Sequence, residues 1–290
     1  MAQFRANKTD VGVRADIFIA RRYPRYTRSS LEKLFKDRSV TIDGNPIRPS
    51  YKIKTTDRIA VDEQLINATP PKITLPVIYE DNNVIVINKP AGVLTHSKGA
   101  LNTEATVASF IRPEVDSELE GNRAGIVHRL DRATSGVIIA AKNKNALNWL
   151  QKQFSARKTK KVYAALVDGV PEPNEAIIDL PVARNPRKPQ TFYVSADGKP
   201  AQTYYQTIKS FTDKQRTCSL MLLKPRTGRT HQIRVHLAYI DHAVVGDAIY
   251  GKPGPHLMLH AKSLELTLPD RTRQTFEAGL PTYMEEFIPQ

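Results

Sequence analysis

One short segment of this chain, residues 125–136, gathers groups that nucleophilic or acid–base chemistry needs. It reads Gly-Ile-Val-His-Arg-Leu-Asp-Arg-Ala-Thr-Ser-Gly, so that Asp131 lies between Arg129 and Arg132. Nearby cations keep a carboxylate ionised and therefore available as a nucleophile or a base. An Asx-type turn with surface ion pairs is the other interpretation of the same spacing. The residues of this segment alone leave both open.

A second segment, residues 227–236, reads Thr-Gly-Arg-Thr-His-Gln-Ile-Arg-Val-His. A helix start that is rich in hydrogen-bond donors suits an anionic partner. His231 and His236 are five positions apart, no acidic residue accompanies them, and Cys218 is the chain's single cysteine. Since zinc sites need a closer set of histidine, cysteine or carboxylate ligands, we expect no metal site here. Each histidine by itself fits a hydrogen-bonded scaffold.

A third segment, residues 160–169, reads Lys-Lys-Val-Tyr-Ala-Ala-Leu-Val-Asp-Gly and has the composition of a strand. Side chains alternate along a strand, so Tyr163 faces away from its two neighbours. A tyrosine in such a place either packs in the core with a tethered hydroxyl or stacks on a nucleic-acid base.

The elements that must position these residues fall into two parts, as 290 residues predict. Residues 1–12 read as a polar, loosely held tail. The spacing of Val13, Ile17 and Ala20 predicts a helix that Pro24 ends, and Ser29 with Glu32 predicts a capping box before a second helix. A hairpin with an Asp-Gly turn at 43–44 and a strand at 57–61 complete a helix–helix–hairpin domain over 13–62.

Residues 63–72, which end in two prolines, are predicted to be a linker, and residues 73–290 a second domain. The sequence of this second domain predicts mainly strands with a few helices. An amphipathic helix is expected around 147–154, and another over 231–240 with Thr230 as its N-cap. The expected strands are 77–79, 84–87, 125–127, 137–140, 161–167, 203–208 and 217–223. This pattern places Asp131 in a short loop between two buried strands, where catalytic groups concentrate.

The charge balance points to a polyanionic partner. The chain holds 43 Lys and Arg against 29 Asp and Glu, a net charge of +14, and residues 1–72 carry half of that excess. A basic surface of this size is typical of nucleic-acid binders, although it also serves solubility. Seven cations cluster on the two short helices and beside them, as a phosphate-gripping face would need: Arg21, Arg22, Arg25, Arg28, Lys33, Lys36 and Arg38.

Composition also excludes several classes. With 40% hydrophobic and 25% charged residues, the chain can bury a core, which excludes general disorder. No apolar run approaches the ~20 residues that span a bilayer, and the first residues do not resemble a secretory signal. A lone cysteine excludes an intrachain disulfide and fits a reducing cytoplasm. We therefore expect a cytoplasmic protein without a membrane partner.

Taken together, these segments resemble the RluA-type pseudouridine synthases. The run from His128 to Gly136 is similar to the catalytic motif of that family, and residues 161–169 and 227–236 are similar to its second and third motifs. Asn-Lys-Pro-Ala-Gly at 88–92 fits its opening hairpin, and the similarity continues to about residue 288. Residues 13–62 separately resemble the RNA-binding domain first seen in ribosomal protein S-four.

The resemblance implies roles residue by residue. Asp131 matches the catalytic aspartate, Tyr163 the active-site tyrosine against the target base, and Arg234 the arginine that pairs with the aspartate. The residues expected to contact the RNA are Arg129, His128, Arg229 and His231 near the flipped nucleotide, with Arg28 and Lys36 on the small domain. No cofactor and no metal are implied, because the reaction isomerises a uridine without oxidation or an incoming group.

The expected fold is α+β, with a large mixed, mainly antiparallel sheet in the catalytic domain and a small helix–helix–hairpin RNA-binding domain at the N-terminus. The expected substrate is structured RNA, with large-subunit ribosomal RNA first and transfer RNA second, and the enzyme is expected to act as a monomer. Two other function classes make different demands on these residues. A non-enzymatic RNA-binding or ribosome-assembly factor would not need Asp131, Tyr163 and Arg234 together. A phosphohydrolase would want a second acid two positions after Asp131, where this chain has Ala133.

Overall fold

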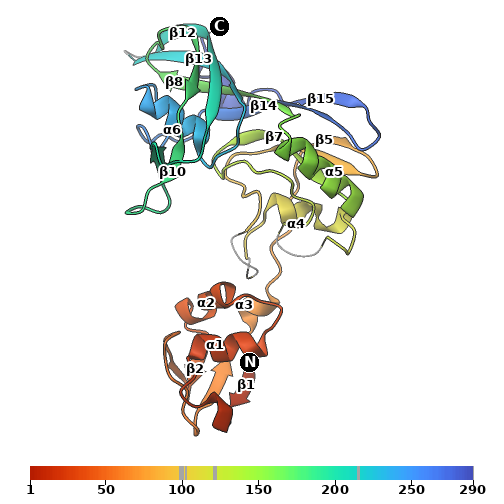
Figure 1. Cartoon of the computed structure of the whole chain (residues 1–290), viewed down its shortest axis with the longest axis vertical. Helices are drawn as coiled ribbons and strands as arrows, with labels where there is room; N and C mark the ends of the chain where they lie inside the picture. The colour runs from red at the N-terminus through yellow and green to blue at the C-terminus, as the bar shows by residue number, and fades with distance from the viewer. Residues whose placement is uncertain (98–100, 102, 120–122, 214–215, 290) are drawn as a thin grey trace. The chain divides into compact units, whose positions relative to one another are not determined.

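The computed structural model describes residues 1–97, 101, 103–119, 123–213 and 216–289. The chain forms two compact units (Figure 1). The small unit is made of Met1–Ile73 with the described part of residues 96–110, and the large unit holds Thr74–Thr95, Ile111–Leu119 and Ala124–Gln290. Among the described residues, no helix has the length and apolar character needed to cross a bilayer.

Two helices pack on a four-stranded sheet in the small unit. The sheet order is β1-β4-β2-β3, and its core holds Phe18, Leu31, Leu34 and Ile59. The elements are β1 Ala2–Arg5, η1 Lys8–Asp10, α1 Ala15–Arg22, α2 Arg28–Lys36, β2 Val40–Ile42, β3 Asn45–Pro46, β4 Arg58–Val61 and α3 Gln64–Asn67. Asp43 and Gly44, at φ of 47° and 78°, both have the left-handed conformation that a tight type I′ hairpin needs, which confirms the predicted turn.

The prediction of a loose tail over 1–12 was wrong. β1 pairs antiparallel with β4, and Phe4 meets Phe18 edge to face with ring centroids 6.4 Å apart. Phe4 alternates with polar neighbours, as in a half-buried strand. The strand is only four residues long, too short for this alternation to be recognised in the sequence. The Ser29–Glu32 capping box was also wrong, because the side chain of Thr27 caps α2 by accepting from the Ser30 amide at 3.2 Å.

Residues 63–72 contain α3, so they are not wholly extended as a linker would be. The side chains of Leu65 and Ile66 pack against the core of the small unit. Leu101, far along the chain, is buried in the same core. The small unit therefore uses residues outside 13–62.

The large unit is built on a single broad sheet with the order β5-β6-β7-β14-β8-β13-β12-β9, in which β15 pairs with β14. Every pairing in this sheet is antiparallel except β7 with β14. Its strands are β5 Val77–Glu80, β6 Val84–Lys89, β7 Ser135–Ala141, β8 Lys160–Asp168, β9 Glu175–Asp179, β12 Gln202–Asp213, β13 Arg216–Pro225, β14 Leu259–Thr267 and β15 Arg273–Glu277. The predicted α+β class with a mixed, mainly antiparallel sheet is confirmed.

The remaining elements flank this sheet. They are α4 Val107–Ile111, η2 Arg112–Glu114, α5 Lys144–Ser155, the two-stranded pair β10 Val182–Arg184 and β11 Phe192–Val194, α6 Gln232–Tyr239 and α7 Thr282–Glu285. Helix α5 begins at the Asn143 N-cap and lies against β7, burying Ala146 and Leu150 (Figure 1). Trp149 of the same helix packs against this core, where its Nε1 donates to the Thr267 carbonyl at 2.8 Å and the Arg271 guanidinium lies 4.1 Å from its ring centroid.

Two expectations about the site-bearing segments were wrong. Residues 125–127 form no strand, because only Ile126 makes an isolated bridge to Ala140. Gly125 has a φ of 72°, and a Cβ there would lie 2.2 Å from the Ala141 carbonyl oxygen, so the backbone beside β7 leaves the extended conformation that a strand needs. Helix α6 has His231 as its N-cap, in the left-handed conformation at φ 57°, instead of Thr230.

Candidate functional site

The backbone of the loop that carries Asp131 is fixed from both ends. Thr95 Oγ1 donates to the Leu130 carbonyl at 2.8 Å and accepts from the Leu130 amide at 3.2 Å. The Arg132 carbonyl accepts from the Gly92 amide at 2.8 Å and from Lys89 Nζ at 3.2 Å. The loop is thus held at its backbone, which leaves the side chain of Asp131 free to project.

Lys89 is fully buried beneath this loop. Its ammonium also donates to the carbonyls of Pro90 at 2.9 Å and Val93 at 2.8 Å, so that three backbone oxygens receive its three hydrogens. Burial lowers the pKa of Lys89 to about 7, and the nearby Asp131 carboxylate opposes that lowering. The lysine therefore links the family-like Asn-Lys-Pro-Ala-Gly turn to the Asp131 loop.

Arg234, on the first turn of α6, is shared by two carboxylates. Its Nε and Nη2 each donate to Asp247 at 2.7 Å, a bidentate pair, while Nη1 lies 3.6 Å from Asp131 Oδ2. Although burial alone would raise it, the pKa of Asp247 is lowered by this guanidinium and by the Ile249 and Tyr250 amides. The predicted pairing of Arg234 with Asp131 is present, but as the longer of the two contacts.

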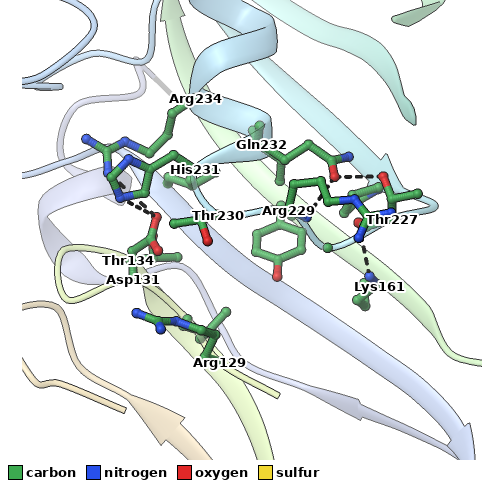
Figure 2. Close-up of a pocket in the computed structure, with 16 residues that line it drawn as sticks. Arg129, Asp131, Thr134, Lys161, Thr227, Arg229, Thr230, His231, Gln232 and Arg234 are labelled. Carbon is green, nitrogen blue, oxygen red and sulfur yellow. Dashed lines mark hydrogen bonds and ion pairs between the residues drawn. The ribbon is translucent and has the colours of Figure 1, made fainter. Parts of the chain in front are cut away.

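His231 reaches the same carboxylate from the N-cap of α6. Its Nε2 lies 3.7 Å from Asp131 Oδ2 (Figure 2). Its Nδ1 is 2.8 Å from the Tyr250 hydroxyl. That hydroxyl accepts from the Phe192 amide at 2.9 Å. Burial lowers the pKa of His231, so that the neutral ring predominates at neutral pH.

Tyr163 completes the site from β8. Burial, followed by the charge of Asp131, raises the pKa of its phenol, so the hydroxyl stays protonated. An open cleft of about 600 Å³ is lined by Asp131, Tyr163 and Arg234 together. Three further cations line it: Arg129, Lys161 and Arg229. The cleft thus combines one carboxylate, one neutral phenol and a strongly positive wall (Figure 2).

A buried polar network supports the start of α6. Gln232 Oε1 accepts from Thr227 Oγ1 at 2.7 Å and from the Arg229 amide at 3.0 Å, and its amide nitrogen donates to Thr203 Oγ1 at 2.9 Å. His236 lies 3.0 Å from Thr203 Oγ1 through Nδ1 and 2.9 Å from the Leu180 carbonyl through Nε2. Because only a protonated Nε2 can bond a carbonyl, His236 acts as scaffold.

The predicted contact residues fall into three groups. Arg129, Arg229 and His231 line the cleft. His128 is committed elsewhere, because its Nε2 accepts from the Ile139 amide at 3.1 Å and its ring stacks on Phe154 with centroids 4.6 Å apart. Burial lowers the pKa of His128 to about 3, so it stays neutral in a groove beside the cleft. The third group, Arg28 and Lys36, belongs to α2 of the small unit, where Arg28 pairs with buried Asp16 at 2.9 Å.

Sequence reasoning missed four residues that build the site: Lys89, Lys161, Asp247 and Tyr250. Asp247 and Tyr250 lie in the stretch after residue 236 over which the resemblance to the family continues, but their spacing does not show what they do. Lys89 and Lys161 also stand in segments that match the family, but nothing in those segments shows that their side chains support the site. Within the described residues, no group of three His, Cys, Asp or Glu side chains is arranged to hold a metal ion.

Comparisons with known proteins agree with this geometry. Residues 83–239 match the family model for RNA pseudouridylate synthase, and residues 13–59 match the S4 domain. An uncharacterized RNA pseudouridine synthase of Aquifex aeolicus is 38% identical over 82% of this chain and 77% of its own length. Ribosomal large subunit pseudouridine synthase D of Yersinia pestis is 34% identical over 97% of this chain and 91% of its own length.

Solved structures point to the same family. Human RNA pseudouridylate synthase domain containing 1 superposes with a TM-score of 0.60 and 27% identity, over 73% of this chain and 86% of that one. Because these relatives are pseudouridine synthases, the comparisons exclude the alternatives of a non-enzymatic RNA-binding factor and of a phosphohydrolase. The chain belongs to the RluA-type RNA pseudouridine synthase family and carries an N-terminal S4 domain.

Proposed function

We propose that this enzyme converts specific uridines of structured RNA, and of large-subunit ribosomal RNA in the first place, to pseudouridine, with Asp131 as its catalytic carboxylate. The observation that carries the proposal is the convergence of Asp131, Arg234 and Tyr163 on one cleft, with Asp131 Oδ2 3.6 Å from Arg234 Nη1. The relatives named for the large ribosomal subunit match nearly the whole chain, which favours that RNA. Transfer RNA is the second candidate.

The reaction is a balanced rearrangement. The N1–C1′ bond of the uridine breaks, the base turns, a C5–C1′ bond forms, C5 loses its proton and N1 gains one. Positive charge builds on the sugar as the glycosidic bond breaks, and an ionised carboxylate beside it can stabilise that charge. Asp131 can act by attack at C1′, by addition to C6 or by removal of the C2′ proton.

The protonated Tyr163 and the cationic wall fit the other steps. A phenol that stays neutral offers a flat face against the target base, and its hydroxyl is a candidate for the C5 proton transfer. A base inside folded RNA must be flipped out before it can react, at a cost of a few kcal/mol. Arg129, Arg229 and His231 line the cleft where contacts with the flipped nucleotide would offset that cost.

The small unit supplies RNA affinity in this proposal. An S4 domain matches over 13–59, and α2 presents Arg28 and Lys36 on its exposed side. The sequence suggests an RNA-binding domain at 13–62, a linker at 63–72 and a catalytic domain at 73–290. In this division, every proposed catalytic residue belongs to the catalytic domain. We also infer a monomeric enzyme of the cytoplasm, a setting that suits its single buried cysteine, Cys218.

Mapping pseudouridines in cellular RNA with and without this protein tests the substrate. We expect one or a few sites in large-subunit ribosomal RNA to disappear in the deletion and to return with the wild-type chain but not with Asp131→Asn. If sites disappear only from transfer RNA, transfer RNA is the substrate instead of large-subunit ribosomal RNA. A deletion that leaves every site in place would refute the substrate proposal.

A variant with Lys36→Gln tests the assigned role of the small unit. Each phosphate contact releases counterions, so its removal should weaken binding to the long RNA and lower the slope of log affinity against log salt by about 0.7–0.9. Turnover of saturating RNA should persist. An unchanged affinity and salt slope would show that this end of α2 is a solvated face.

A further inference from the structure

We propose that Lys161, with Arg129 and Arg229, binds a backbone phosphodiester of the RNA strand next to the target nucleotide, at the point where the cleft opens into a second groove. The inference rests on the proposed action on RNA and adds a specific anion site to it. It assigns a function to Lys161, which the chemistry at Asp131 does not use.

The second groove adjoins the cleft on the side of α5. It encloses about 1200 Å³ and shares Lys161, Tyr163 and the two arginines with the cleft, so these residues lie at the junction of the two cavities. Its far wall includes Phe154 and Arg157 at the end of α5. A strand that places one nucleotide in the cleft can therefore continue along this groove.

Lys161 is a half-buried cation that no described carboxylate neutralises. Its only hydrogen bond among the described residues is a weak one of 3.5 Å to the Thr227 carbonyl, and no described carboxylate forms an ion pair with it (Figure 2). Burial lowers the pKa of Lys161 to about 8, so it remains mostly charged at neutral pH. A charge that is partly withdrawn from water gains from an opposite partner, and an anionic ligand would supply one to Lys161.

The neighbouring lysine behaves in the opposite way. Lys160 and Lys161 are consecutive on β8, so their side chains leave opposite faces of the sheet. Lys160 Nζ lies 3.0 Å from Glu265 Oε1, and its side chain is 72% exposed. Lys160 thus forms a solvated ion pair on the surface, whereas Lys161 faces the cleft.

The rest of the groove has the same sign. Five cations line it, and none of its described lining residues is Asp or Glu: Arg129, Arg157, Lys161, Arg226 and Arg229. The bonds that Arg226 and Arg229 make are to neutral oxygens, Gln202 Oε1 at 3.1 Å and the Pro200 carbonyl at 3.0 Å. His128 covers one face of Phe154, so that face is not available to a base, and the five cations favour an anionic ligand such as a phosphate.

The test uses the full chain and RNA in which single phosphates flanking the target uridine are replaced by uncharged methylphosphonates. With the wild type, we expect one such replacement to weaken binding about tenfold and to lower the salt slope by about 0.7–0.9. Lys161→Gln should weaken binding of unmodified RNA by a similar factor and should then be insensitive to that replacement. Lys161→Arg should keep most of the affinity. Lys160→Gln, which removes the same charge from the other face, should behave as the wild type.

The outcomes separate this inference from the proposed function. If the wild type releases tritium from RNA labelled at C5 of uridine but Lys161→Gln binds with wild-type affinity and salt slope, the phosphate site is refuted while the function stands. Equal loss of affinity in Lys161→Gln and Lys160→Gln would also refute it, since only general charge would then matter. If the wild type isomerises no RNA, the proposed function fails first. Thermal unfolding of each variant verifies that a loss of binding is not a loss of fold.

Discussion

Two loops present a carboxylate to Arg234, and they hold it very differently. In the turn after residue 244, Asp247 is 1% exposed and accepts four hydrogen bonds of 2.7–3.1 Å, from the guanidinium and from the Ile249 and Tyr250 amides. In the loop before β7, Asp131 Oδ2 lies 3.6 Å from Arg234 Nη1 and 3.7 Å from His231 Nε2. Both distances are longer than a hydrogen bond.

The difference in hydrogen bonding suits Asp247 to support Arg234 and Asp131 to react with the substrate. A carboxylate saturated by short bonds is a poor nucleophile and a poor base, but it fixes the orientation of the arginine that it binds. With Nε and Nη2 held by Asp247, Arg234 can offer only Nη1 to Asp131. A carboxylate with long contacts keeps its lone pairs for the substrate, and its loop is instead fixed at the backbone by Thr95 and Lys89. We expect substitutions at the two aspartates to separate accordingly.

Asp131→Asn should cause the largest loss of activity. It keeps the size of the side chain but removes the charge that stabilises the sugar, so single-turnover tritium release should fall ~10³-fold or more. RNA affinity should stay within a few-fold, and thermal stability should stay close to that of the wild type. Turnover comparable with the wild type would exclude Asp131 as the catalytic carboxylate.

Asp247→Asn should cause the largest loss of stability. Removing one partner of a buried ion pair leaves the other charge uncompensated, at a cost of about 3–5 kcal/mol in the free energy of unfolding. Urea denaturation of the full chain measures this loss. A cost below about 1 kcal/mol would mean that Asp247 is not the support of Arg234.

Arg234→Lys sharpens the comparison from the arginine side. A lysine is a point charge without the planar fork, so it cannot bond Asp247 through two atoms and still face Asp131. We expect the single-turnover rate to fall about 10–100-fold, with a smaller loss of stability than in Asp247→Asn. A rate within a factor of two of the wild type would argue against the shared guanidinium.

Acid pH tests the support that Asp247 gives through the stability of the fold. The folded-state pKa of Asp247 lies below its ordinary value of 3.8, so its contribution to stability is full above that value and is lost as the pH falls through the folded pKa. Below about pH 4, the wild type should therefore lose stability more steeply than Asp247→Asn. Parallel curves of unfolding free energy against pH would contradict this linkage.

Tyr250→Phe should have the smallest effect. It removes the hydroxyl that His231 Nδ1 contacts and leaves the Phe192 amide without that acceptor, at a cost of about 1 kcal/mol. Activity should fall by less than tenfold, because His231 is one of two groups near Asp131. A loss as large as that of Asp131→Asn would give the tyrosine a direct part in the reaction.

What could be predicted from sequence depended on the range of the interactions. Continuous apolar runs predicted β6 and β7, the composition of residues 160–169 predicted β8, and the Asp-Gly pair predicted the hairpin turn. The motif positions brought Asp131, Tyr163 and Arg234 to one site. The role of Asp247 arises from contacts between segments far apart in the sequence, which no spacing reveals. The N-cap of α6 was misplaced because a left-handed histidine is unusual at a position where Thr230 offers a normal cap.

The packing of Trp149 of α5 against the end of β14 has a practical consequence. It is the only tryptophan of the chain and belongs to the large unit, whereas the aromatic side chains of the small unit are tyrosines and phenylalanines. Fluorescence excited at the red edge of the indole band therefore reports the large unit selectively, while circular dichroism reports both. Comparing the two signals during denaturation would reveal whether the RNA-binding and catalytic units unfold as one cooperative system or independently.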